Sequence, residues 1–259
     1  MTDRRIVRRA FSWRIVSRVE RPEAVVLALV LAGVAAAGWY ASAFWMAVAI
    51  GVQLVLGGLG AVWVIGPATA RLGFARYATL AAAGVALTVF GRLTVGSIGL
   101  AMLPISAVLL WAVVWLELQA NRVGRSGLGL ELALIGIVFA SAAGIASLVG
   151  ADGWPAGMAL TLAVAAVPAM RSAERRSRFG AEAMGQALLH LLAIAQVAAA
   201  AALLTIPPIV GAALLALTFH AWGGAAESLD EGASARSVAV EFGALAVLGL
   251  VVALLLSGG

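Results

Sequence analysis

Residues 128–149 read LGLELALIGIVFASAAGIASLV and contain one charged side chain, Glu131. An α-helix needs about 20 mainly apolar residues to cross the hydrocarbon core of a bilayer, so this stretch suits a transmembrane span. Similar stretches lie on both sides of it, at residues 23–41, 44–66, 77–93, 96–118, 154–170, 182–204, 207–226 and 237–257. The sequence therefore predicts an all-α fold, a polytopic transmembrane bundle of about nine helices.

The composition agrees with this prediction. The chain is 63% hydrophobic and 11% charged, whereas soluble domains are about 25% charged. A water-soluble fold of this size cannot bury so much apolar surface. The chain has no cysteine, which excludes disulfides, thiolate metal sites and a cysteine nucleophile. Its basic residues lie between the predicted spans, where membrane orientation explains them, so we expect a lipid bilayer and no nucleic acid as partner.

The arginines divide unequally between the two sides of the predicted bundle. If the N-terminus is cytoplasmic, every arginine except Arg92 falls in a cytoplasmic segment. The positive-inside rule thus predicts a bacterial or archaeal cytoplasmic (inner) membrane protein with its N-terminus inside and its C-terminus outside. Aromatic residues of the kind that line membrane interfaces fall in the predicted outer turns, at Trp39, Tyr40, Phe44, Trp45 and Trp154.

The first 22 residues precede this single transmembrane domain, residues 23–259. Residues 4–19 alternate arginine pairs with apolar side chains. This pattern is typical of a basic amphipathic helix on the anionic inner leaflet. A basic tail that merely sets the topology is the alternative.

An internal repeat is suggested by three glutamates that open the first, fifth and ninth spans. Glu23, Glu131 and Glu241 stand at nearly equal spacing, and each follows an arginine. Trp45 and Trp154 recur at a similar offset. We therefore expect two four-helix repeats, residues 23–126 and 131–235, and a closing helix at 237–257.

Nine helices running four plus four plus one, with the N-terminus inside, resemble the UbiA-type intramembrane prenyltransferases. The resemblance implies a cytoplasm-facing cavity and a lipophilic or isoprenoid ligand. That family binds magnesium diphosphate through Asp-rich motifs in the loops after its second and sixth helices. The corresponding loops here, PATARLGFAR at 67–76 and RSAERRSRFG at 171–180, contain no Asp. No catalytic residue of the family can therefore be assigned in this chain.

Polar side chains inside lipid are costly, so each one within a predicted span is a candidate for ligand binding. The candidates lie near the cytoplasmic ends of the spans and are Glu117, Asn121, Glu182, Gln186, His190, His220 and Glu227. Glu182, Gln186 and His190 follow an i, i+4, i+8 spacing and share one helix face. His190 and His220 lie at similar depths, so two antiparallel neighbours could present both.

Three interpretations of these residues stay open: a paired-histidine haem or metal site, a proton-linked or substrate-binding polar cluster, and simple bonding between helices. Bonding between helices is the most common of these three roles for polar side chains near a membrane interface. Glu227, Asp230 and Glu231 form an acidic cluster that could hold Mg²⁺ with a substrate phosphate, or could be a solvated loop. Glu117 and Asn121 repeat its i, i+4 spacing, and Arg125 offers Glu117 an ion pair.

The function predicted first is a UbiA-like membrane protein with a cytoplasm-facing polar cavity for a lipophilic ligand, with or without chemistry on it. A secondary transporter is the second hypothesis, although such proteins place polar groups near the bilayer midplane, where this chain has few. A non-catalytic subunit of a membrane complex is the third. The sequence specifies neither the ligand nor a reaction.

Overall fold

The computed structural model describes residues 22–66, 73–123, 127–150 and 153–257. Residues 1–21, which carry the predicted amphipathic segment, lie outside the described residues. The helices are α1 (Pro22–Tyr40), α2 (Ala43–Ile65), α3 (Ala75–Val123), α4 (Leu128–Val149), α5 (Trp154–Arg175), α6 (Gly180–Leu203), α7 (Pro208–Asp230) and α8 (Ala235–Ser257).

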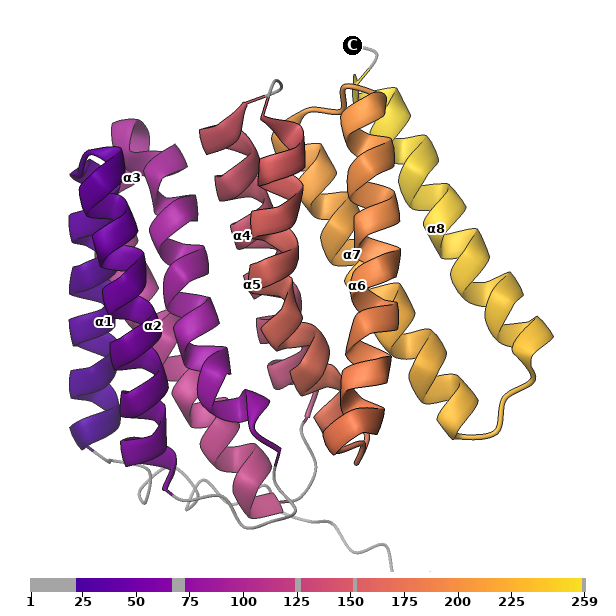
Figure 1. Ribbon diagram of the computed structural model, residues 1–259, viewed down its shortest axis with the longest axis horizontal. Helices are drawn as coiled ribbons and strands as arrows, with labels where there is room; N and C mark the ends of the chain where they lie inside the picture. Colours follow the sequence, from indigo (N-terminus) through magenta and orange to yellow (C-terminus); the bar gives the residue numbers. More distant parts are fainter. Residues whose placement is uncertain (1–21, 67–72, 124–126, 151–152, 258–259) are drawn as a thin grey trace, which may run out of the picture.

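Helix α3 contains two membrane spans. At Ile98 the backbone leaves the helical region, with φ −138° and ψ 19°, and the chain folds back so that both ends of α3 lie at the lower end of the bundle (Figure 1). The two arms, Ala75–Thr94 and Ala101–Ala120, are each long and apolar enough to cross a membrane. The described residues thus form nine candidate spans, which confirms the predicted all-α, multi-pass bundle.

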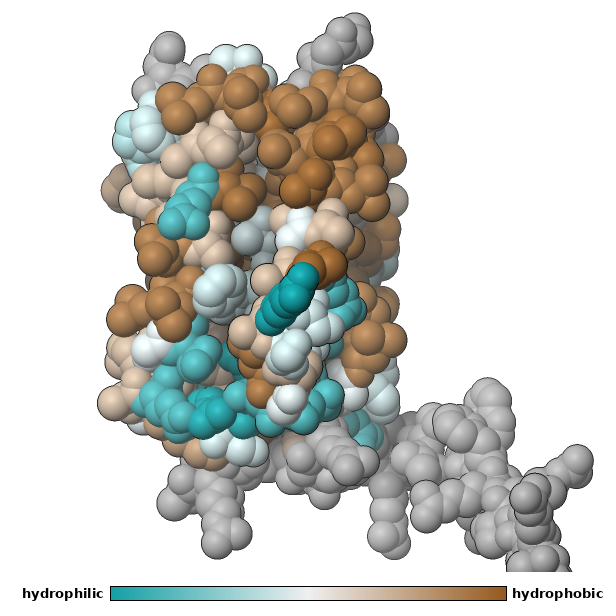
Figure 2. Space-filling view, turned by 90° about the vertical axis from the view of Figure 1, so that its right-hand side faces the viewer, coloured by the Kyte–Doolittle hydropathy of each residue, from teal (hydrophilic) through white to brown (hydrophobic). Residues whose placement is uncertain are grey.

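The spans alternate in direction from the start of α1 at the lower end to the end of α8 at the upper end (Figure 1). The hydrophilic side chains gather in a band at the lower end, while the surface above is mainly hydrophobic (Figure 2). The helix ends at this lower end carry all the described arginines but Arg92, and we call it the arginine-rich end.

The helices pack in two groups. In the first, α1, α2 and the two-armed α3 pack against one another. In the second, α4 packs on α5, α5 on α6, α6 on α7, and α7 back on α4. Helix α3 joins the groups by contacting α4 and α5, and α8 packs on α7. Each group thus contains four spans and contacts a further helix, α4 for the first and α8 for the second. The two four-helix repeats stay a prediction.

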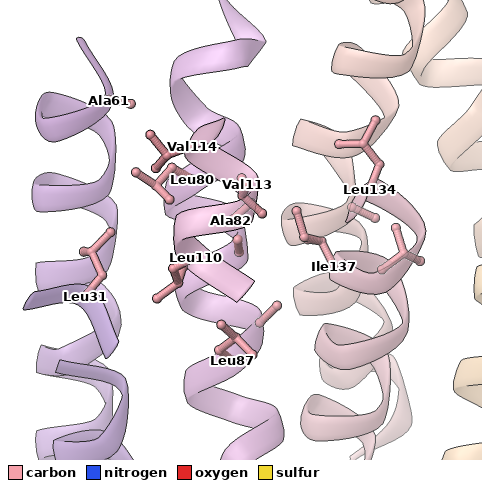
Figure 3. Packing of buried hydrophobic residues seen from close by; sticks show 14 of the residues in the cluster. Leu31, Ala61, Leu80, Ala82, Leu87, Leu110, Val113, Val114, Leu134 and Ile137 are labelled. Atoms are coloured by element: carbon pink, nitrogen blue, oxygen red, sulfur yellow. The ribbon is translucent and has the colours of Figure 1, made fainter. Parts of the chain in front are cut away.

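The core of the first group continues across α3 into α4. Leu31, Leu80, Leu110 and Leu134 are fully buried in one hydrophobic cluster, and their side chains point into the spaces between α1, α3 and α4 (Figure 3). In lipid, such contacts stabilise the bundle through van der Waals packing, because lipid tails are as apolar as leucine.

Glycine permits the closest approach between α2 and α3. A Cβ atom at Gly57 would lie 2.7 Å from Cα of Ala81, which leaves no room for a side chain, whereas Gly58 faces open space. Gly57 is therefore the residue that lets these two backbones meet.

One residue of the predicted aromatic belt lies elsewhere. Tyr40, Phe44, Trp45 and Trp154 are exposed, but Trp39 is only 3% exposed. Its indole Nε1 donates a hydrogen bond to the carbonyl of Leu87 on α3, at 3.0 Å. Trp39 therefore fills the upper end of the first group instead of facing the membrane interface.

Candidate functional site

Two regions of the second group differ from ordinary helix packing: a layer of polar side chains at the arginine-rich end, and an apolar cavity at the opposite end. The polar layer contains most of the residues singled out by the sequence. The cavity was not predicted.

The polar layer begins with a helix that is longer than expected. The sixth span was predicted to end at residue 170, before Arg171, but α5 continues to Arg175. Arg171 is buried there because its guanidinium binds Glu117 on the second arm of α3 through two hydrogen bonds, Nε to Oε1 at 2.9 Å and Nη2 to Oε2 at 2.6 Å. A bidentate pair of this kind satisfies both charges and allows the helix to keep an arginine inside the bundle.

Glu174 extends this ion pair to the first arm of α3. Its Oε2 lies 3.5 Å from Nη1 of Arg171, and its Oε1 accepts a hydrogen bond from the backbone N–H of Ala75 at 2.8 Å. A carboxylate at the first residue of a helix also meets the positive end of the helix dipole. Glu117, Arg171 and Glu174 thus tie both arms of α3 to α5. Glu117 was predicted to pair with Arg125, which lies outside the described residues; its partner is Arg171.

A second set of contacts joins α4, α5 and α7. Oε1 of Glu131 lies 2.9 Å from Nδ1 of His220, and its Oε2 lies 3.6 Å from Nη2 of Arg175. His220 therefore pairs with Glu131 on α4, and not with a residue of α6, the helix that carries His190.

His190 is fully buried between α6 and α7. Its Nε2 lies 3.0 Å from the carbonyl oxygen of Phe219, and its ring stacks on that of Phe219 with centroids 4.3 Å apart. A carbonyl only accepts, so Nε2 carries the proton and Nδ1 is an acceptor. Nδ1 has no hydrogen-bond partner among the described residues. The two histidines thus contact different helices.

The remaining candidates lie at the edge of this layer. Arg178 donates hydrogen bonds to Glu182 and, at 2.7 Å, to Asp230. The hydrogen bond to the Asp230 carboxylate raises the pKa of Arg178. Gln186 is half-buried, and the side chain of Asn121 is outside the described part of the chain. Glu231 caps the end of α7 and is exposed.

Arg176 shares a narrow space with Glu227. Its Nε and Nη1 are buried and lack hydrogen-bond partners in the described ranges. Burial lowers the pKa of Arg176, and the nearby Asp230 and Glu227 oppose that shift. The space beside it measures only about 10 Å³, room for one water molecule. A second, more open pocket at this end lies at the start of α8 and is lined by Ser234, Arg236, Ser237, Val240 and Glu241. The cytoplasm-facing polar cavity stays a prediction.

The described residues contain no group of three His, Asp or Glu side chains placed to hold a metal ion. Asp230 is bound by Arg178, and Glu227 faces the narrow space beside Arg176. A Mg²⁺ ion shared by Glu227, Asp230 and Glu231 stays a prediction.

The apolar cavity lies at the opposite end of the second group and measures about 300 Å³. The last turns of α4 and α6 and the first turns of α5 and α7 enclose it. Its walls are mainly small side chains, among them Ala142, Ala146, Gly157, Ala198, Ala201, Ala202, Gly211 and Ala212. Among the described residues, its polar side chains are Thr161 and Thr205 and the indole of Trp154, and none of its described side chains is ionisable.

Sequence reasoning missed the cavity and the buried arginines for different reasons. Alanine and glycine on a helix face predict close packing, and only the arrangement of four helices decides whether a hollow is left. Arg171, Glu174 and Arg175, by contrast, follow an i, i+3, i+4 spacing that could have extended α5 beyond residue 170.

No family model matches this chain, and no curated protein or solved structure is significantly similar to it.

Proposed function

We propose that this protein binds a lipophilic molecule inside the membrane, in the cavity between α4, α5, α6 and α7. The observation that supports this function is a cavity of about 300 Å³ whose described wall residues include no ionisable side chain. Small-molecule pockets measure about 300–1,000 Å³ and are mostly apolar. Apolar cavities stay dry and take up apolar molecules, so the natural occupant is a molecule already dissolved in the bilayer.

The positive-inside rule places the arginine-rich end in the cytoplasm, so the cavity belongs to the outer half of the bilayer. The UbiA-type resemblance suggests an isoprenoid chain as the lipophilic part of the ligand. Chemistry on that ligand would need reactive groups, and the cavity wall contains none beyond two hydroxyls and an indole. Binding is therefore the function that we propose.

A secondary transporter is the second candidate, and one observation favours it. The cavity lies at one end of the second group, while ion pairs among α4, α5 and α7 close the other end. A transporter in a conformation that is open to one side of the membrane has a cavity at one end and a closed opposite end. Uptake of a fluorescent lipophilic probe into proteoliposomes, compared with empty liposomes, tests this candidate directly.

Native mass spectrometry of the protein purified in mild detergent tests ligand binding. We expect the wild-type chain to carry one lipophilic molecule, and the Ala201→Phe variant, whose ring fills the cavity, to carry none. Ala200→Phe is the matched control, because Ala200 is the preceding residue of α6 and is exposed. Equal occupancy of the two variants, or an empty wild-type protein, would contradict the proposed function.

A further inference from the structure

The hydroxyl of Thr161 makes no hydrogen bond to its own helix. Six other helical Thr and Ser side chains do donate to a carbonyl of their own helix, namely Thr79, Thr88, Thr94, Ser141, Ser147 and Thr218, whereas the buried hydroxyl of Ser106 has no partner among the described residues. Thr161 is only 5% exposed, yet its hydroxyl has no hydrogen bond to any described residue. It lies in the wall of the cavity.

Its depth separates Thr161 from the other polar groups of the cavity. Thr161 is two turns along α5 from Trp154, about 10 Å below the outer end of the helix at 1.5 Å per residue. Thr205 and Trp154 are exposed at the outer end, where water can satisfy them. The neighbours of Thr161 in the cavity wall are mainly apolar, so its hydroxyl is the polar group that a ligand meets at this depth.

The chemistry of the wall limits what can satisfy this hydroxyl. A charged headgroup placed beside Thr161 would need a counter-charge, and the described side chains of the wall offer none. An oxygen atom of an uncharged group, a hydroxyl or a carbonyl, needs only one hydrogen bond. The rest of the ligand then fills the alanine-lined space with hydrocarbon.

Building on the proposed function, we infer that the ligand is an uncharged lipid with a hydroxyl or carbonyl oxygen, and that Thr161 selects it by a hydrogen bond to that oxygen. Thr161 is thereby the specificity-determining residue of the cavity. The polar end of the ligand enters first and lies about 10 Å deep.

Three probes of equal chain length test this selection: 1-dodecanol, dodecane and dodecanoate, added to the purified protein in detergent and measured by native mass spectrometry. We expect 1-dodecanol to bind about 5- to 10-fold more tightly than dodecane, the ratio that one hydrogen bond of about 1 kcal/mol gives. We expect dodecanoate to bind more weakly than the alcohol, because its charge has no partner in the cavity.

Variants of Thr161 test whether its hydroxyl causes the preference for 1-dodecanol over dodecane. Thr161→Val has nearly the same shape without the hydroxyl, so it should bind the alcohol and the alkane equally. Thr161→Ser should keep the preference. Thr218→Val is the control, because the Thr218 hydroxyl bonds to the carbonyl of Leu214 on its own helix at 2.8 Å and lies outside the cavity wall.

The outcomes separate this inference from the function on which it rests. If the wild-type protein binds the alcohol and the alkane equally, or if Thr161→Val keeps the preference, the role of Thr161 is wrong although the cavity binds lipophiles. If neither probe binds better to the wild-type protein than to Ala201→Phe, both proposals fail.

Discussion

The upper ends of the two helix groups differ: the first is filled and the second is hollow. In the first, the indole of Trp39 lies inside the bundle and bonds to α3, and Met102 packs beside it. In the second, the matching end of α4 carries Ala142 and Ala146, which leave the cavity open.

Two groups whose helices pair in a similar way can therefore differ in how completely side chains fill the space between the helices. Protein interiors are packed nearly as densely as organic crystals, and few voids exceed the size of a water molecule. The second group departs from this filling at its upper end, where it has an open pocket of about 300 Å³. The following predictions test this contrast, from the largest expected effect to the smallest.

Arg171→Met should have the largest effect, because Arg171 holds the two groups together. The substitution leaves Glu117 and Glu174 as uncompensated buried carboxylates, and breaking a buried pair in this way costs about 3–5 kcal/mol. We expect little folded protein after membrane extraction, as measured by size-exclusion chromatography. Arg178→Met, which breaks an exposed pair, is the control; a similar loss in both variants would show that burial is not the cause.

Trp39→Ala should hollow out the first group. Trp39 is buried and packs beside Met102, so its removal leaves a cavity and frees the carbonyl of Leu87, for a loss of about 3 kcal/mol. Thermal unfolding in detergent measures this loss. Trp45→Ala, at an exposed position, should unfold within a few degrees of the wild-type protein, and an equal drop would remove the distinction between filled and lipid-facing positions.

Gly57→Val should separate α2 from α3. Its side chain would collide with the backbone of Ala81, and overpacking of this kind costs about 1–3 kcal/mol. Gly58→Val makes the same change at the next residue, which faces open space. The midpoint of thermal unfolding should fall for Gly57→Val alone; a matching fall for Gly58→Val would point to helix propensity as the cause.

Gly211→Ala should give the smallest effect and the opposite sign. A Cβ atom there meets only the Cβ of Ala201, at 3.9 Å, so the substitution fits and should add about 0.4–1 kcal/mol of stability by restricting the unfolded chain. Gly144→Ala, where the added atom would lie 2.6 Å from the backbone of Val89, should lower the unfolding midpoint. If both variants gain stability, the face of α4 that meets α3 is not more tightly packed than the cavity.

Much of the fold was predictable from the sequence, because the cost of exposing polar backbone to lipid leaves helices as the available structure. Most ends of the nine spans were predicted within a few residues. The fourth span was predicted to begin at residue 96 but begins at Ala101, after the break at Ile98, and the sixth was predicted to end at residue 170 but α5 continues to Arg175. The second error arose because an arginine was taken to mark the membrane surface. Burial of Arg171 depends on Glu117, which is far away in the sequence, so local hydropathy could not reveal it.

The candidate residues were predicted less well than the spans. Spacing along single helices placed Glu182, Gln186 and His190 on one face, and it suggested that both histidines face a shared space. The structure instead pairs Glu182 with Arg178, His190 with the carbonyl of Phe219, and His220 with Glu131. Which side chains meet across helices depends on helix rotation, and a sequence with few charges contains little information about that rotation.

The sequence by itself determined that the chain crosses a membrane, how many times it does so and where most helices begin, since these follow from the transfer of apolar and charged groups between water and lipid. Only the tertiary structure decided which arginines are buried, that Trp39 turns inward and that a cavity opens beside Thr161. These features arise from contacts between helices whose apolar faces look alike in sequence, and close packing distinguishes them only in three dimensions.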